Sequence, residues 1–69
     1  MSDDHIYKRI DLVGSSTTSS DEAIRNAIAR AAETVKNLEW FEVDQIRGHI
    51  KDGKVAHYQV VLHVGFRID

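Results

Sequence analysis

Hydrophobic and polar residues follow two different spacings along this chain, and the change of spacing divides it into four segments. Residues 6–13, with the sequence IYKRIDLV, alternate and are rich in β-branched side chains, which predicts a strand. Residues 40–51 and 54–68 are predicted to form two more strands. The Asp52-Gly53 dipeptide between them is typical of a two-residue type I′ turn, so these two strands are expected to form a hairpin.

The segment between the first and second strands has the spacing of an amphipathic helix. It follows a run of small polar residues from Gly14, GSSTTSS, which is predicted to be a loop. Within that run, Ser19 and Glu22 have the spacing of a capping box, in which each side chain bonds a free backbone N–H at the helix start. The apolar positions recur every three or four residues and form one alanine-rich stripe: Ala23, Ile24, Ala27, Ile28, Ala31, Val35 and Leu38. We therefore expect another element to pack closely against this helix.

The order strand, helix, strand, strand in 69 residues predicts an α+β fold with one domain that spans residues 1–69. We expect a three-stranded, antiparallel-type sheet packed on one helix. If the connection through the helix is right-handed, the first and second strands are parallel and the third lies between them, which is strand order 1-3-2.

The hairpin register divides the residues of the last two strands between two faces of the sheet. Counting outward from the turn pairs Lys51 with Lys54 and, further along, Phe41 with Val64, and paired side chains share a face. The face expected to meet the helix carries Phe41, Val43, Val60, Leu62, Val64 and Phe66. These residues are the predicted contribution of the hairpin to the core.

The opposite face of the predicted hairpin is half polar and carries the only tryptophan of the chain. The same register places Trp40 opposite Gly65, Glu42 opposite His63, Asp44 opposite Val61 and Ile46 opposite Gln59. A large aromatic side chain on such a face indicates a subunit interface or a ligand site.

The tryptophan has the neighbours that a stacking site for a flat heterocycle would need. Gln59 would supply an amide, which both donates and accepts hydrogen bonds, and Arg47 or Arg67 would supply a cation. The uninterrupted register, however, places Arg47 on the helix face opposite Tyr58, where a charge is unfavourable. Either the strand contains a bulge near Gly48, or Arg47 lies beyond the helix end, where solvent begins.

The composition limits the classes of function that are open to the chain. A 69-residue domain is only marginally stable by itself, and without cysteine it has no disulfide, so we expect stability to come from a partner chain. The formal net charge of −2 gives no basic surface for nucleic acid, and no apolar run is long enough to span a membrane. The N-terminal residues MSDDHIYKR are polar and acidic, unlike a signal peptide, so a cytoplasmic location is expected.

Five stretches of the chain together resemble the dodecin family: DLVGSSTTS, NLEWFEV, IRGHI, AHYQVVL and VGFRI. The resemblance covers nearly the whole chain. It implies a small protein that stores or sequesters a flavin, in bacterial members FMN, at the subunit contacts of a hollow homododecamer. It also implies that Trp40 stacks on the flavin, that Gln59 bonds the isoalloxazine edge, and that Arg47 belongs to the same site.

The resemblance further implies coenzyme A as a second ligand, whose phosphates would need cations. The candidates for coenzyme A are Arg67, Arg30, Lys36 and Lys8. Arg30 and Lys36 lie on the outer face of the predicted helix, where solubility alone would account for their charges.

Three other classes of function are alternatives. No nucleophile with a neighbouring base stands out, so no catalytic residue is assigned, although a bound flavin would allow a flavin-dependent redox enzyme. A nucleic-acid module is disfavoured because Glu42 and Asp44 flank the single indole, whereas RNA-binding sheets carry several aromatics and a basic face. A structural oligomer would differ only in lacking the ligand.

His63 and Glu42 are expected to form a cross-strand charge pair, and no metal site is assigned.

Overall fold

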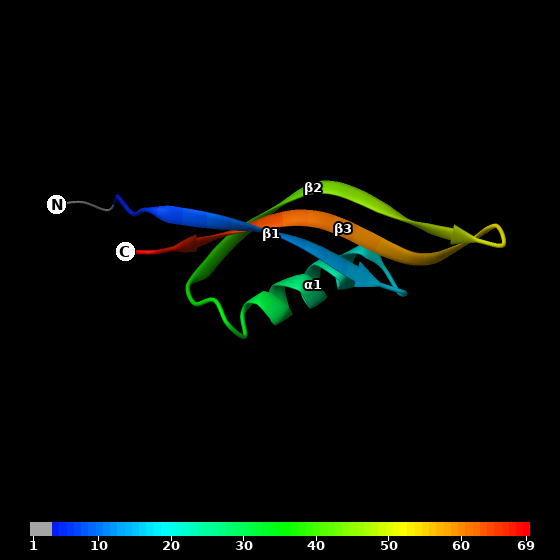
Figure 1. The fold of residues 1–69 in the computed structure, drawn as a ribbon, viewed down its shortest axis with the longest axis horizontal. Helices are drawn as coiled ribbons and strands as arrows, with labels where there is room; N and C mark the ends of the chain where they lie inside the picture. The colour runs from blue at the N-terminus through cyan, green and yellow to red at the C-terminus, as the bar shows by residue number, and fades with distance from the viewer. Residues whose placement is uncertain (1–3) are drawn as a thin grey trace.

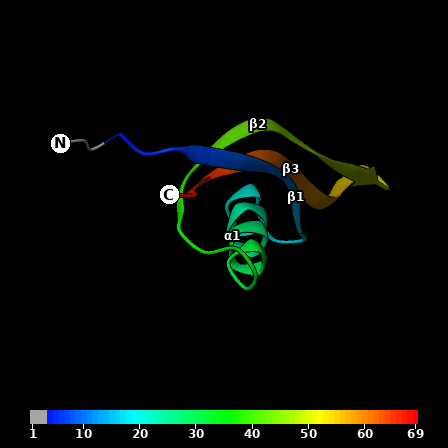
Figure 2. The same ribbon diagram turned by 60° about the vertical axis from the view of Figure 1, so that its left-hand side comes forward.

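The computed structural model describes residues 4–69, which form a three-stranded sheet with a helix on one of its faces (Figures 1 and 2). The elements are β1 (Tyr7–Ser16), α1 (Ser20–Ala31), β2 (Leu38–Lys51) and β3 (Lys54–Arg67). β3 lies at the centre of the sheet and is antiparallel to both neighbours, so β1 and β2 run in the same direction. The predicted α+β fold and the strand order 1-3-2 are confirmed.

β1 continues through the small polar residues that were expected to begin a loop. Gly14 pairs with Val60 and Ser16 pairs with Tyr58, so the prediction that the loop begins at Gly14 is wrong. The ladder to β3 satisfies the backbone groups of these residues in place of a turn. Gly14 also lies directly beneath the helix, because a Cβ atom there would be 2.0 Å from the backbone oxygen of Ala23. The close packing expected from the alanine-rich stripe is therefore confirmed.

At the start of α1, one of the two hydrogen bonds of the predicted capping box is present and the other is replaced. Ser19 is the N-cap, and its Oγ accepts a hydrogen bond from the backbone N–H of Glu22 at 3.0 Å. The backbone N–H of Ser19 donates to the hydroxyl of Ser16 at 3.4 Å, where the capping box would have used the Glu22 carboxylate. Asp21 and Glu22 lie in the first turn, where the helix dipole favours negative charge.

The end of α1 comes earlier than the apolar stripe predicted. The helix ends at Ala31, so the prediction that the stripe continues in one helix through Val35 to Leu38 is wrong. Asn37 has a φ of 65°, and its backbone oxygen accepts a hydrogen bond from the N–H of Arg67 at 3.2 Å. The chain must reverse here because Leu38 already belongs to β2.

The core lies between α1 and the inner face of the sheet. Its fully buried members are Ala23, Val60, Leu62 and Val64. Partly buried residues packed around them are Ile10, Leu12, Ile24, Ala27, Ile28, Leu38 and Val43. α1 packs mainly over β1 and β3. Of the core residues predicted on β3, Val60, Leu62 and Val64 are fully buried, but Phe66 is only partly buried and is not part of the core cluster. Phe41 of β2 remains 48% exposed.

The ladder between β2 and β3 contains bulges that an uninterrupted register does not allow. Near the turn, Lys51 pairs with Lys54 as predicted. Ile50 then pairs with Val55 and His49 with His57, which leaves Ala56 as an extra, unpaired residue on β3. Asp44 is an extra residue on β2, between the pairs made by Val43 and Gln45. A bulge on each strand displaces the register in opposite directions, so their effects cancel beyond Asp44.

The predicted register is consequently right next to the turn and again from Val43 to Trp40, but it is wrong in the middle of the ladder. A third shift, between Trp40 and Leu38, makes Glu39 an extra residue on β2 and pairs Leu38 with Phe66. Trp40 pairs with Gly65, Phe41 with Val64, Glu42 with His63 and Val43 with Leu62, as predicted. The predicted pairs of Asp44 with Val61, Ile46 with Gln59 and Arg47 with Tyr58 are wrong. The observed pairs are Gln45 with Val61, Ile46 with Val60 and Arg47 with Gln59.

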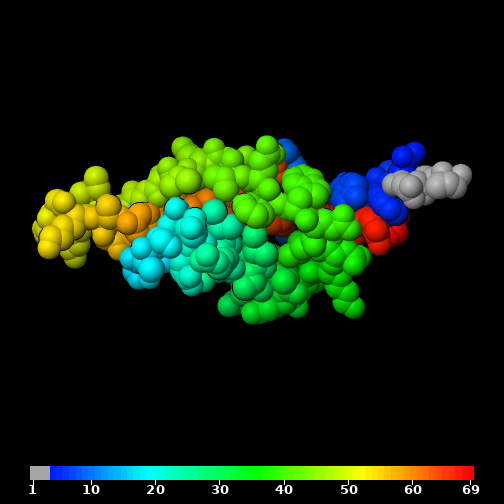
Figure 3. Space-filling model, turned by 180° about the vertical axis from the view of Figure 1, so that it is seen from behind, coloured from blue at the N-terminus to red at the C-terminus, as the bar shows by residue number. Residues whose placement is uncertain are grey.

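The chain is long and thin for its size, and the hairpin turn projects beyond the helix (Figure 3). Its extents are 58 × 21 × 14 Å and its radius of gyration is 14.6 Å, whereas a compact domain of this length has about 11 Å. Its accessible surface is 5165 Å², against about 4,400 Å² for a typical monomer of this mass. Among residues 4–69, no helix has the length and apolar character needed to cross a membrane.

Candidate functional site

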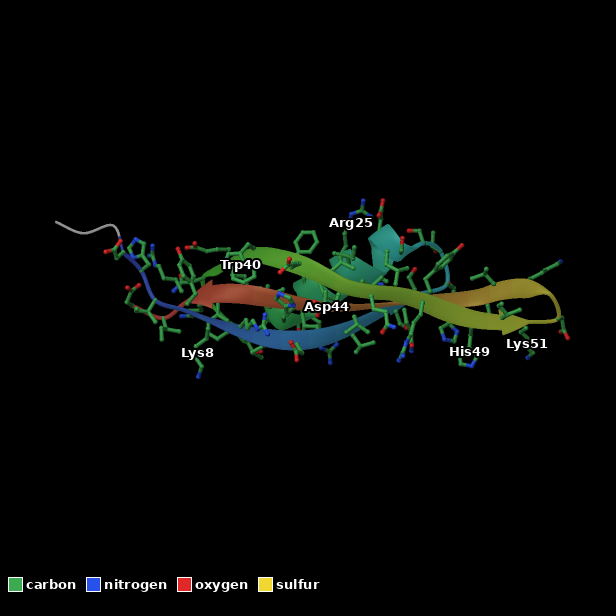
Figure 4. All side chains as sticks on the ribbon, turned by 90° about the horizontal axis from the view of Figure 1, so that it is seen from above. Lys8, Arg25, Trp40, Asp44, His49 and Lys51 are labelled. Carbon is green, nitrogen blue, oxygen red and sulfur yellow. The ribbon has the colours of Figure 1, made fainter. Side chains whose placement is uncertain are left out.

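Trp40 lies on the face of the sheet that α1 leaves uncovered (Figure 4). The nitrogen-side edge of its indole lies over Gly65, because a Cβ atom on Gly65 would be 2.1 Å from Trp40 Cε2 and 2.6 Å from Nε1. Only glycine leaves room for this approach. The tryptophan residue remains 43% exposed. The site therefore begins with an aromatic ring that is supported by the central strand and accessible from outside.

Arg47 and Gln59 are brought together by the bulge at Ala56. They form a directly opposed pair, and Arg47 Nε donates a hydrogen bond to Gln59 Oε1 at 3.3 Å. The register shift expected near Gly48 is found between His49 and Ile50, although the extra residue, Ala56, is on β3. This shift removes Arg47 from the helix face, so the alternative, in which Arg47 keeps the uninterrupted register and lies beyond the helix end, is wrong. The strands approach closely at this point, since a Cβ atom on Gly48 would be 2.6 Å from the backbone oxygen of His57.

His63 is buried beside Trp40 and holds two carboxylates of β2. Its Nδ1 is 3.0 Å from Asp44 Oδ2, and its Nε2 is 3.0 Å from Glu42 Oε1. The imidazole meets the indole of Trp40 edge to face, with ring centroids 5.9 Å apart. The hydrogen bond to Asp44 raises the pKa of His63 above its ordinary value, and the bond to Glu42 adds to this, although burial opposes it. The imidazolium form is therefore favoured to a higher pH than in a free histidine.

β1 adds two charged residues to the same cluster. Arg9 lies opposite Gly65 and Asp11 lies opposite His63, and Arg9 Nη1 is 3.5 Å from His63 Nε2. Asp11, Asp44 and His63 each offer a donor atom within 4.8 Å of the others. Both ring nitrogens of His63 already have carboxylate partners. Hydrogen bonds and ion pairs among these residues therefore explain why the acidic groups and the imidazole lie so close together. The predicted cross-strand pair of His63 with Glu42 is part of that network.

The four cations considered for coenzyme A come from separate parts of the fold. Arg67, at the end of β3, lies 3.9 Å from Glu39 and 3.7 Å from Asp69, and its Nε is buried without a hydrogen-bond partner within the described chain. Arg30, in the last turn of α1, makes an exposed ion pair with Glu33 at 3.7 Å. Lys36 is exposed in the segment between α1 and β2, and Lys8 on β1 pairs with Phe66.

Comparison with known proteins places this geometry in a family. The family model for dodecins matches residues 6–69. The chain belongs to the dodecin family. A dodecin from Thermus thermophilus is 50% identical over 64 residues, which cover 93% of each chain.

Solved dodecin structures have the same fold as this chain. The dodecin from Streptomyces davaonensis is 52% identical, with a TM-score of 0.89, over 94% of this chain and 96% of that one. The dodecin from Streptomyces coelicolor is 48% identical, with a TM-score of 0.92, over 99% of this chain and 97% of that one. The similarity extends over nearly the full length of both structures.

One residue beside Trp40 of this dodecin, Arg9, was missed from the sequence, and the partner of another was predicted wrongly. Asp44 was expected on the face of Trp40 but opposite Val61, whereas it is an extra residue at the bulge and bonds His63. Arg9 was missed because no turn connects β1 to β3, so there was no fixed point from which to count their register. The available signal for Asp44 was its spacing of two from Glu42, since alternate residues of a strand share a face.

Proposed function

We propose that this dodecin binds FMN, or another flavin, stacked on Trp40, and stores or sequesters it. The observation that carries the proposal is the position of the indole, which lies over Gly65 on the uncovered face of the sheet and remains 43% exposed. Stacking on an aromatic side chain favours binding of a planar heterocycle through its π-face. A tryptophan that served only the core would lie under α1.

The pair formed by Arg47 and Gln59 supports a flavin as the heterocycle. The isoalloxazine ring has an edge with both donors and acceptors, and the Gln59 amide can match either kind. Arg47 lies on the same face, directly opposite Gln59, where a cation would serve the phosphate or the ribityl chain. In this proposal Trp40 supplies the stacking surface, Gln59 bonds the ring edge, and Arg47 binds the polar tail.

The proposed assembly is a homododecamer, with the flavin sites at the contacts between subunits. The elongated shape and the excess of exposed surface favour association of this chain with copies of itself. Several large apolar side chains are exposed in one chain: Val13, Phe41, Ile46, Ile50 and Val55. We infer a cytoplasmic protein that has neither a nucleic acid nor a membrane as partner.

We propose coenzyme A as a second ligand, with Arg67 as its first contact. The Nε of Arg67 is buried and has no hydrogen-bond partner within residues 4–69, so an anion that reaches it would gain a charge-assisted bond. Arg30, Lys36 and Lys8 are the further cations of this proposal.

The proposed role is storage and not catalysis. The functional groups of the site are a ring, an amide and an arginine, which suit binding and do not form a nucleophile with its base. When bound, the flavin supplies an excited state that the neighbouring indole can quench by electron transfer, so stacking on Trp40 would suppress flavin photochemistry. A flavin-dependent redox enzyme is the alternative, which steady-state oxidase and reductase assays would detect.

The test is a titration of FMN with the purified protein, followed by flavin fluorescence. We expect strong quenching that saturates near one flavin per chain. Trp40→Ala is expected to weaken FMN binding by roughly 5–150-fold, because stacking contributes about 1–3 kcal/mol per ring. Trp40→Phe keeps an aromatic ring and is expected to lose less.

Two outcomes would count against this function. Unchanged flavin fluorescence at micromolar wild-type protein would favour a ligand-free structural oligomer, in which Trp40 serves a subunit interface. An affinity of Trp40→Ala within a factor of two of the wild type would mean that the flavin binds elsewhere.

A further inference from the structure

His63 is placed between two partners that compete for one of its ring nitrogens. Nε2 lies 3.0 Å from the Glu42 carboxylate and 3.5 Å from Arg9 Nη1. A carboxylate only accepts hydrogen bonds and a guanidinium only donates them, so Nε2 can serve Glu42 only when protonated and Arg9 only when deprotonated. The protonation state of Nε2 therefore determines whether His63 forms a hydrogen bond with Glu42 of β2 or with Arg9 of β1.

The other ring nitrogen has a single partner. Nδ1 lies 3.0 Å from Asp44, a carboxylate, so this nitrogen carries a proton in either state. The neutral tautomer with its proton on Nδ1 keeps the bond to Asp44 and frees Nε2 to accept from Arg9. Loss of one proton would therefore release Glu42 alone.

Glu42 and Arg9 both adjoin the stacking site. Glu42 is two residues from Trp40 on the same face of β2, and Trp40 and Arg9 flank Gly65 from opposite sides. The imidazole itself meets the indole edge to face at 5.9 Å. The charged groups that face His63 are Arg9 and Asp11 from β1 and Glu42 and Asp44 from β2, while α1 lies on the far side of the sheet.

We propose that His63 is a positioning residue that makes the stacking site sensitive to pH. With both nitrogens protonated it holds Glu42 and Asp44 beside Trp40, and loss of the Nε2 proton releases Glu42 and loosens the indole. The link to ligand binding rests on the flavin site proposed above, whereas the link to Trp40 itself does not.

The direction of the pH effect follows from the pKa of His63. The hydrogen bonds to Asp44 and Glu42 raise that pKa in the folded chain above the unfolded value of about 6.5. The contacts of the imidazolium are therefore fully present below about pH 6.5 and are lost as the pH rises through the folded pKa. Flavin affinity and the order of the indole are expected to fall over the same range.

The first measurement is the intrinsic fluorescence of the assembled, flavin-free protein between pH 5.5 and 9. Trp40 is the only tryptophan, and a protonated imidazole in contact with an indole quenches its emission. We expect emission to rise with pH, with a midpoint above about 6.5. His63→Gln should abolish the transition, and Glu42→Gln should move its midpoint to lower pH, because it removes one of the charges that favour the imidazolium.

His49→Gln is the matched control, because His49 lies on the same face but stacks on His57 near the hairpin turn. The variant is expected to keep the wild-type transition. Wild-type emission that is flat with pH, or a transition that survives in His63→Gln, would overturn the proposal whether or not the protein binds flavin.

The second measurement is the dissociation constant for riboflavin over the same pH range. Riboflavin is used because the phosphate of FMN itself titrates near pH 6. We expect wild-type affinity to fall by about fivefold toward alkaline pH, the lower end of typical coupling between sites. His63→Gln should have a flat profile at the weaker level. No riboflavin or FMN binding at any pH, with the Trp40 transition intact, would refute the flavin function and leave the control of Trp40 by His63 standing.

Discussion

At the scale of single residues, two glycines have different tasks. Gly14 faces the backbone of α1, where an added Cβ would lie 2.0 Å from the oxygen of Ala23. Gly65 faces a side chain, since an added Cβ would lie 2.1 Å from Trp40 Cε2. A backbone clash forces elements apart, whereas a side chain can turn away. The first glycine therefore serves the fold, and the second serves the position of the indole.

We expect Gly14→Ala and Gly65→Ala to separate stability from binding. Gly14→Ala should destabilise the fold by about 1–3 kcal/mol, as overpacking of a core does, and should leave the flavin affinity of the folded protein unchanged. Gly65→Ala should displace the indole and weaken flavin binding at least about fivefold, with a smaller loss of stability. Urea unfolding and flavin titration of both variants would measure this. Equal effects of the two variants on flavin affinity would contradict the assignment.

At the scale of elements, the short helix depends on its cap and on its packing. α1 spans only Ser20–Ala31, a length at which isolated helices are marginal in water. The bond from the Glu22 N–H to Ser19 Oγ satisfies one of the free donors at its start. The rest of its stability comes from the buried alanines, Ala23 and Ala31, which allow the close approach to the sheet.

Ser19→Ala is expected to lower the free energy of unfolding by about 1 kcal/mol, because it removes the cap. Ser20→Ala, one residue further along, is the control and should change stability by no more than a few tenths of a kcal/mol, since alanine is the better helix former. Thermal unfolding of the two variants at one protein concentration gives the comparison. A larger loss in Ser20→Ala would show that the cap lies elsewhere.

The bulges are the second feature at this scale. Ala56 on β3 and Asp44 on β2 each add one unpaired residue to the hairpin. Between them, the alternation of β2 is reversed relative to β3, which turns Arg47 toward Gln59. Beyond Asp44 the original alternation returns, so Trp40 still faces Gly65. The two bulges thus place Arg47 and Trp40 on one face of the sheet. In a regular strand only residues an even number of positions apart share a face, and Arg47 and Trp40 are seven positions apart.

At the scale of the whole molecule, the exposed apolar surface favours an oligomer over a monomer. Phe41 lines an apolar groove of 480 Å³ with Ile24 and Ile28 of α1, on the side where the helix leaves β2 uncovered. A monomer that exposes such a groove, with an elongated shape and a small core, has little stability of its own. Association of copies would bury this surface and stabilise each subunit.

Phe41→Glu is expected to lower the mass of the particle measured by sedimentation at micromolar concentration, because a carboxylate in this groove would have to be desolvated on assembly. The urea midpoint of the wild type should rise with protein concentration, as it does when folding and assembly are linked. Thr17→Glu adds the same charge in the exposed turn before α1 and should assemble normally. Retention of the wild-type mass by Phe41→Glu would exclude the groove from the subunit contacts.

Local patterns in the sequence determined the elements and the strand order, because hydrophobic periodicity, a cap and a turn dipeptide act within a few residues. They also determined the outward position of Trp40, although the register used to predict it was wrong between Ala56 and Asp44 and right beyond them only because the bulges cancel. Tertiary structure alone decided the partner of Arg47 and the bonds of Asp44 and Arg9 to His63, whereas the pair of His63 with Glu42 was predicted from the register. A bulge depends on how two strands twist and pack together. The position of Arg47 indicated a shift near Gly48, but no residue type within this hairpin identifies Ala56 and Asp44 as the extra residues.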